Sequence, residues 1–128
     1  MRADTLLYRQ VHPHFVAGGQ LTSQAFLPFP KDDGELSAYD GSLISAAKAF
    51  EHYTQALRFE SVAVYAVSKA EADSEGVPAE SQPLENFPEH AKIDFNQVPQ
   101  KTWRKVAKKL KIRAIERGCQ FSPEDERE

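Results

Sequence analysis

The stretch Ser61 to Ser68 reads Ser-Val-Ala-Val-Tyr-Ala-Val-Ser and is the longest apolar run of the chain, rich in β-branched residues. Such a composition is typical of a β-strand. Because side chains alternate across a sheet, Val64 lies on one face and Val67 on the other, so neither face is polar. The run therefore predicts a central strand of a mixed or antiparallel sheet, covered on both sides.

Two amphipathic helices are expected to cover this sheet. Helical periodicity begins after Ser45, a favourable N-cap, and continues to about residue 57. A second helix is predicted from Pro99 to Arg117, because proline suits a first helical turn and Gly118 suits the position after the last. The residues of its expected buried stripe are Trp103, Val106, Ala107, Leu110 and Ala114. Together with the strands they predict an α+β fold.

Shorter segments complete the expected sheet. Thr5 to Val11 reads as a strand beside the central one, and Gln20 to Leu27 as a weaker strand. The three prolines between Val77 and Pro88 predict a loop. Glu89 to Phe95 alternates apolar and polar residues, which predicts an edge strand with one solvated side.

Length and composition favour a single domain. The chain has 128 residues, of which 41% are hydrophobic, and eight phenylalanines are enough for one core. We expect a globular domain over residues 1–121, followed by an acidic, flexible tail over residues 122–128.

Cysteine usage and hydropathy indicate a reducing compartment. Cys119 is the single cysteine, and the N-terminal residues have no apolar core of the signal-peptide type. No run approaches the roughly 18 apolar residues of a membrane span. We therefore expect a cytoplasmic protein without a membrane span, and a bacterial origin is consistent with this.

Charge is segregated along the chain. The net charge is only −3, yet half of the sixteen lysines and arginines fall between Lys101 and Arg117, where Glu116 is the sole acid. Helical geometry places most of these cations opposite the buried stripe. The partner-binding residues expected on this face are Arg104, Lys105, Lys108, Lys109, Lys111 and Ile112. A cationic surface with an apolar residue predicts binding of an acidic protein partner.

Three other interpretations of the basic face remain open. It is also typical of a solvated helix surface that keeps a small protein soluble. An RNA backbone or an anionic membrane surface would attract the same charges. Aromatic residues for base stacking are missing among the cations, so nucleic acid is expected to bind through phosphate contacts only.

Histidines can act as metal ligands or as an acid and base pair. His12 and His14 flank a proline, and His90 shares one side of its predicted strand with Asp94. No third ligand follows at a recognisable spacing, so exposed or capping roles are favoured for His12, His14 and His90. We expect no metal and no cofactor.

One local pattern resembles the ADP-ribosyltransferases. It consists of Leu7-Tyr-Arg9, then Gly18-Gly19, then Leu21-Thr-Ser23. The resemblance implies that Arg9 contacts a phosphate of the dinucleotide and that Ser23 supports its ribose.

The resemblance covers about twenty residues. The glutamate that such enzymes need has no counterpart, since Glu60 and Glu89 precede their strands. A nucleotide- or nucleic-acid-directed enzyme that uses Arg9, Ser23 and His90 is therefore the alternative hypothesis. We favour Arg9 and Ser23 as ordinary strand residues facing solvent.

A broader pattern resembles a group of small, uncharacterised bacterial proteins. It comprises Leu-Thr-Ser-Gln-Ala-Phe from Leu21, Leu-Ser-Ala-Tyr-Asp-Gly from Leu36, and Pro-Glu-His-Ala-Lys-Ile-Asp-Phe from Pro88. The resemblance implies a self-contained domain, and such proteins are associated with defence or toxin-antitoxin type operons. The sequence as a whole predicts a non-enzymatic protein-interaction module, an accessory component of such an operon, that binds through its basic C-terminal helix.

Overall fold

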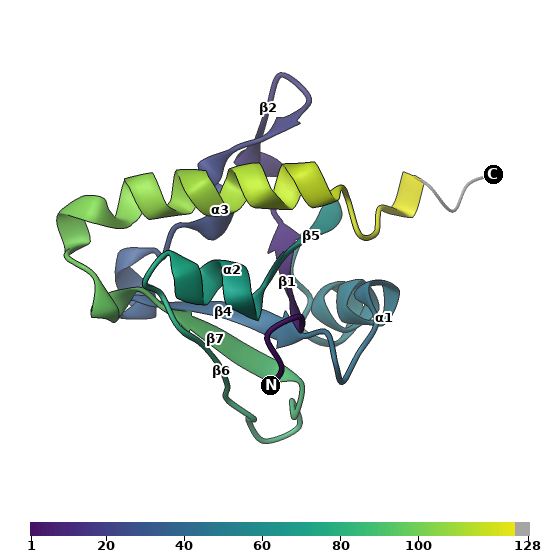
Figure 1. The fold of residues 1–128 in the computed structure, drawn as a ribbon. Helices are drawn as coiled ribbons and strands as arrows, with labels where there is room; N and C mark the ends of the chain where they lie inside the picture. The colour runs from purple at the N-terminus through teal and green to yellow at the C-terminus, as the bar shows by residue number, and fades with distance from the viewer. Residues whose placement is uncertain (125–128) are drawn as a thin grey trace.

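A five-stranded antiparallel sheet forms the centre of the computed structural model, which describes residues 1–124 (Figure 1). Its strand order is β5-β1-β4-β7-β6. The bounds are Leu6–Val11 for β1, Glu35–Asp40 for β4, Ala63–Ser68 for β5, Ala79–Ser81 for β6 and His90–Asp94 for β7. A separate hairpin pairs β2, Val16–Ala17, with β3, Gln20–Leu21.

Helices cover both faces of this sheet. The α-helices are α1, Ala46–Glu51, α2, Lys69–Ser74, and α3, Trp103–Arg117. A π-helical turn, η4, extends α1 over His52–Ala56. The 3₁₀ turns are η1, Pro13–Phe15, η2, Ser23–Phe26, η3, Pro30–Asp32, η5, Phe95–Gln97, and η6, Gln100–Thr102. The predicted α+β class is confirmed.

Two hydrophobic clusters divide the core between the two faces of the sheet. On one face, Leu7 and Ile93 from the sheet belong to the same cluster as Leu110 of α3 and Ala72 of α2. On the other face, strand residues pack with Ala49 of α1. In Figure 1, α3 is the long yellow-green helix across the top, and α1 lies to the right of β1.

The main predictions for the two helices are confirmed. The Ser45 Oγ accepts a hydrogen bond from the Lys48 N–H at 3.2 Å and so caps α1. The Trp103 indole packs edge-on against Phe95, and its Nε1 donates to the Val98 carbonyl at 3.3 Å. The other members of the predicted stripe are all buried, namely Val106, Ala107, Leu110 and Ala114.

The position of the Ser61 to Ser68 strand was predicted wrongly. Its β5 lies at the margin of the sheet, while β1, β4 and β7 are interior. The outer edge of β5 forms one isolated bridge with the segment after α3, in which the Val64 N–H donates to the Phe121 carbonyl at 2.8 Å. The apolar composition of β5 therefore reflects two covered faces and not a central place in the strand order.

Two other strand predictions also need correction. The predicted edge strand, β7, lies between β4 and β6, and the edge is instead β6, which forms inside the expected proline-rich loop. The predicted strand Gln20 to Leu27 ends after Leu21, and η2 follows it. There Ala25 and Phe26 are both buried although they are adjacent, which an alternating strand with one solvated face would not allow.

The sheet divides between β1 and β4. These strands pair only at Leu7 with Asp40 and at Tyr8 with Tyr39, whereas β1 pairs with β5 at six positions and β4 with β7 at five. Beyond the pair Tyr8 and Tyr39, β1 therefore pairs only with β5, and β4 pairs only with β7. This split leaves backbone groups that need partners from outside the ladder.

A row of ion pairs joins α2 to α3. Glu71 accepts a hydrogen bond from Arg117 at 2.7 Å and lies 3.9 Å from Arg113. Glu75 lies 3.5 Å from Lys109 and 4.0 Å from Arg113. Through these ion pairs the two glutamates neutralise the flank of α3 that faces α2.

Glu71 should make stability depend on acid pH. Burial alone would raise its pKa, but the hydrogen bonds from Arg117 and from the Ser68 N–H outweigh burial and lower the pKa. A lowered folded-state pKa contributes stability that is complete above the unfolded pKa, about 4.3, and is lost as pH falls through the folded pKa. We expect Glu71→Gln to lower the free energy of unfolding at pH 7 by about 1–3 kcal/mol.

Urea unfolding at pH 7 and pH 3 tests this expectation. The difference between wild type and Glu71→Gln should shrink at pH 3, since the wild-type carboxylate is then increasingly protonated. Glu116→Gln is the matched control, because Glu116 is exposed and forms no ion pair within residues 1–124. An equal difference at both pH values would contradict the assigned role.

Candidate functional site

The solvent side of α3 carries most of the predicted partner-binding residues. We define the outer surface of α3 as Arg104, Lys105, Lys108, Lys111, Ile112 and Ile115. Helical geometry places these residues within one contiguous sector opposite the buried stripe. Its four cations form no ion pair within the described residues 1–124.

The outer surface of α3 also has an apolar part. Ile112 is 46% exposed and Ile115 is 45% exposed. Side chains three residues apart on a helix are neighbours, so the two isoleucines form one small patch among the cations. Ile112 was predicted from the sequence and Ile115 was not, although its position in the helical period places it on the same face.

Lys109 differs from the other predicted partner-binding residues. Its ammonium lies 3.5 Å from Glu75 of α2, in the row that also contains Arg113 and Arg117. The sequence did not show that α2 would pack beside α3. Lys109 therefore lies on the flank that faces α2, and not on the outer surface.

A pocket of about 200 Å³ opens where the sheet divides, on the face that α1 and η4 cover. Tyr53 and Leu57 enter its lining from η4 and the residue that follows. π-Helical turns are rare and frequently occur at functional sites, because they redirect side chains. The aromatic lining residues are Tyr8, Tyr39, Tyr53, Phe59, Phe87 and His90.

Arg9 lies in the split between β1 and β4. Its Nε donates to the Ala25 carbonyl at 2.7 Å, and its Nη1 donates to the Ser37 carbonyl at 2.7 Å. Burial lowers the pKa of the guanidinium to about 10, although the nearby Tyr53 and Asp32 act in the other direction. Arg9 remains a cation at neutral pH, and the expectation of an ordinary solvent-facing strand residue is wrong.

Gln10 is the unusual polar group of this pocket. The side chain is only 5% exposed, and neither its Nε2 nor its Oε1 has a hydrogen-bond partner within residues 1–124. Continuing the register of β1 with β4 would place Gln10 opposite Ser37, but the ladder has already ended there. The split therefore leaves a buried amide with unused donor and acceptor capacity beside the pocket.

His90 is fixed in the wall of the pocket. Its Nδ1 lies 2.9 Å from the Gln82 carbonyl and must donate there, since a carbonyl can only accept. In the neutral ring, Nε2 then accepts from the Ser37 hydroxyl at 3.1 Å. Both ring nitrogens of His90 are thus committed, which makes the ring a structural part of the wall.

The residues of the enzyme hypothesis are only partly brought together. Arg9 and His90 line the same pocket, whereas Ser23 begins η2 and does not line it. None of the described residues that line this pocket has a carboxylate. The transferase-like arrangement therefore lacks its second-strand serine and a catalytic acid.

His12 and His14 have local roles. The His12 Nδ1 accepts from the His14 N–H at 3.0 Å and caps η1, and the two rings lie edge to face. Within the described residues no three side chains of His, Cys, Asp or Glu are grouped so that they could hold a metal ion.

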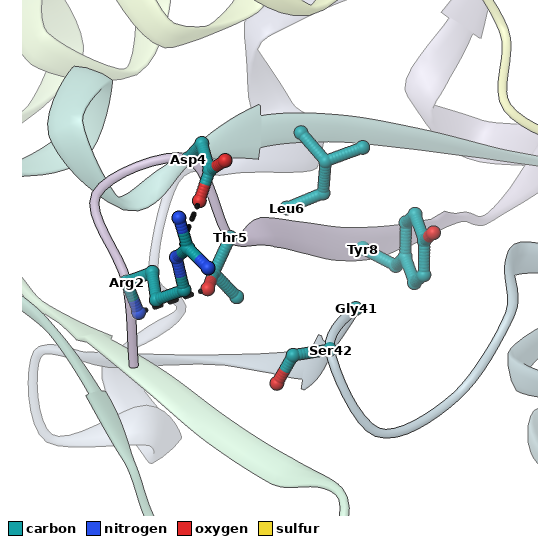
Figure 2. A pocket seen from close by; sticks show the side chains of 7 residues that line it. All are labelled: Arg2, Asp4, Thr5, Leu6, Tyr8, Gly41 and Ser42. Carbon is teal, nitrogen blue, oxygen red and sulfur yellow. Dashed lines mark hydrogen bonds and ion pairs between the residues drawn. The ribbon is translucent and has the colours of Figure 1, made fainter.

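A second hollow, of about 250 Å³, lies near the N-terminus (Figure 2). Arg2 and Asp4 form an ion pair at 3.6 Å on its rim, and the Arg2 N–H donates to the Thr5 Oγ1 at 3.0 Å. Both charged side chains are more than 80% exposed. Because its charged groups pair with each other in solvent, this hollow is a weaker candidate than the pocket at the split.

Comparison with known proteins adds no assignment. No family model, no curated protein and no solved structure matches the chain. Among the described helices, none is both long enough and apolar enough to cross a membrane. The outer surface of α3 and the pocket at the split are therefore the two features that bear on function.

Gln10 gives a direct test of the pocket geometry. Leucine has a similar size and removes the unpartnered buried amide, so Gln10→Leu should raise the free energy of unfolding by about 1–3 kcal/mol. Urea unfolding followed by circular dichroism measures this. Gln55→Leu, at an exposed position of η4, is the control and should change stability little. Destabilisation by Gln10→Leu would show that the amide has partners in the folded protein.

Proposed function

We propose that this protein is a non-enzymatic interaction module that binds an acidic protein partner through the outer surface of α3. One observation carries the proposal: on a single face of α3, four cations that form no ion pair within residues 1–124 surround two half-exposed isoleucines. The cations on the α2 side of the same helix do find acidic partners inside the fold. The cations of the outer surface are therefore available to form ion pairs with a partner.

The chemistry of this surface favours a protein over the two other candidates. Nucleic acid would be held by phosphate contacts, but no aromatic side chain of the outer surface is available to stack on a base. A membrane-bound helix needs a continuous apolar face, and α3 buries its apolar face inside the fold. Ile112 and Ile115 suit a small apolar contact within a charged rim, as protein interfaces have.

The expected partner segment is acidic with at least one apolar side chain. Its apolar residue would cover Ile112 and Ile115, and its carboxylates would reach Arg104, Lys108 and Lys111. Ion pairs at an exposed rim mainly accelerate association, and the apolar contact slows dissociation. A role in a defence or toxin-antitoxin type operon stays a prediction.

The enzyme alternative receives less support. It predicts that Arg9→Ala or His90→Ala removes an activity without loss of stability. However, both side chains hold backbone carbonyls of the fold, and Ser23 lies outside the pocket. A structural role explains Arg9 and His90 without a reaction.

Charge reversal on α3 tests the proposed function. The triple variant Arg104→Glu, Lys108→Glu and Lys111→Glu should lose capture of its partner in affinity purification from the native host. The melting temperature should stay nearly unchanged, since surface substitutions away from specific interactions usually alter stability by less than about 0.5 kcal/mol each.

The matched control reverses three cations elsewhere on the surface, Arg2, Lys31 and Lys48, and so changes net charge by the same amount. It should keep capture. Equal capture by the two triple variants would contradict the proposal. If RNA is captured, and the logarithm of its binding constant falls steeply and linearly with the logarithm of the salt concentration, the partner is a nucleic acid bound through its phosphates and not a protein.

The apolar part of the surface has its own test. Ile112→Ser with Ile115→Ser should increase the dissociation rate of the captured partner by about tenfold, from the loss of roughly 1–2 kcal/mol of apolar contact. Surface plasmon resonance with the captured partner measures this rate. An unchanged dissociation rate would show that Ile112 and Ile115 do not contact the partner and that only the cations do.

A further inference from the structure

The pocket at the split presents hydrogen-bonding capacity that the described residues leave unused. The Gln10 amide is buried and has no partner within the described residues, although its Nε2 can donate and its Oε1 can accept. Leaving such a group unpaired costs free energy that an apolar residue of the same size would avoid. A bound ligand with an acceptor next to a donor would pair with both ends of the amide.

Arg9 adds a positive charge with unused donors. Its Nε and Nη1 hold the carbonyls of Ala25 and Ser37, whereas its Nη2 donates no hydrogen bond within residues 1–124. With its guanidinium fixed by these two bonds, little side-chain entropy would be lost on binding an anion. None of the described lining residues has a carboxylate, and Asp32, which interacts with the charge electrostatically, lies outside the lining.

Aromatic side chains make the rest of the lining suitable for a flat ring. Phe87 packs on Tyr39 with ring centroids 4.8 Å apart and meets His90 edge-on at 5.1 Å. From the helix side, Tyr53 packs on Phe59 at 5.2 Å. Despite this contact Phe59 is 56% exposed, so part of an apolar ring remains accessible in the lining of the pocket.

The size of the pocket limits the ligand. A cavity of about 150 Å³ accepts a benzene molecule, and this pocket measures about 200 Å³. A single six-membered ring with one carboxylate therefore fits, and a nucleotide or a larger cofactor does not.

We infer that the pocket between β1 and β4 binds a small planar carboxylic acid whose ring carries an amide-like edge. The carboxylate pairs with Arg9, the edge pairs with the Gln10 amide, and the ring lies against the aromatic lining. This site is independent of the proposed function, because it opens on the α1 face of the sheet and α3 packs on the other.

Four probe compounds separate these contributions. Orotate has the ring, the carboxylate and the amide edge; benzoate lacks the edge; uracil lacks the carboxylate; and cyclohexanecarboxylate lacks the planar ring. Isothermal titration calorimetry with the full chain should rank orotate as the tightest. Benzoate and uracil should each bind at least about tenfold more weakly than orotate, which corresponds to the loss of one paired interaction.

Gln10→Leu tests the assignment in a variant that is expected to fold. It should bring the affinity for orotate down to that for benzoate and leave benzoate binding unchanged. In two-dimensional NMR spectra of the wild type that correlate amide nitrogens with their protons, the side-chain amide signals of Gln10 should shift on addition of orotate. Gln55→Leu and the charge-reversed α3 variant should bind orotate as the wild type does.

Three results would overturn the inference. The first is that none of the four probes binds at millimolar concentration. The second is equal orotate affinity for wild type and Gln10→Leu. The third is tighter binding of N-acetylphenylalaninamide than of orotate, which would make the pocket a receptor for an aromatic side chain of a peptide.

Discussion

The hydrogen bonds of Arg9 are the constraint on which the centre of the fold depends. Where β1 and β4 separate, the Ser37 carbonyl loses its place in the ladder and accepts from the Arg9 guanidinium instead. The same side chain also holds the Ala25 carbonyl of η2, which packs under α3. One cation thus stabilises the split in the sheet and ties it to a turn on the other layer.

The split gives the protein a hollow that a continuous sheet would lack. Antiparallel strands in full register would satisfy their own backbone groups and leave flat faces. Here β1 continues to pair with β5 while β4 continues to pair with β7, and the gap between β1 and β4 is lined by aromatic side chains and by Gln10. Within residues 1–124 this amide has no partner, which departs from the usual pairing of buried polar groups, and functional sites are where such departures are expected.

Charge is divided within α3 by the packing of α2. Glu71 and Glu75 neutralise the cations on one flank, and these ion pairs help hold the two helices together. The cations on the outer surface of α3 have no such partners in the described chain. The cations of α3 therefore divide into a set that is paired with α2 and a set that forms no ion pair within residues 1–124.

The sequence by itself determined the periodic features: the end of α3 at Arg117, its buried stripe, the Ser45 cap and the two covered faces of β5. Periodicity reports which side of an element is covered, so these could be predicted. The predicted start of the helix at Pro99 is wrong, because the 3₁₀ turn η6 over Gln100–Thr102 precedes α3. Tertiary structure alone decided that β5 lies at the margin, that Lys109 pairs with Glu75, and that Gln10 is left beside a pocket. Each of these depends on which distant segments become neighbours, and no local pattern of residues encodes that choice.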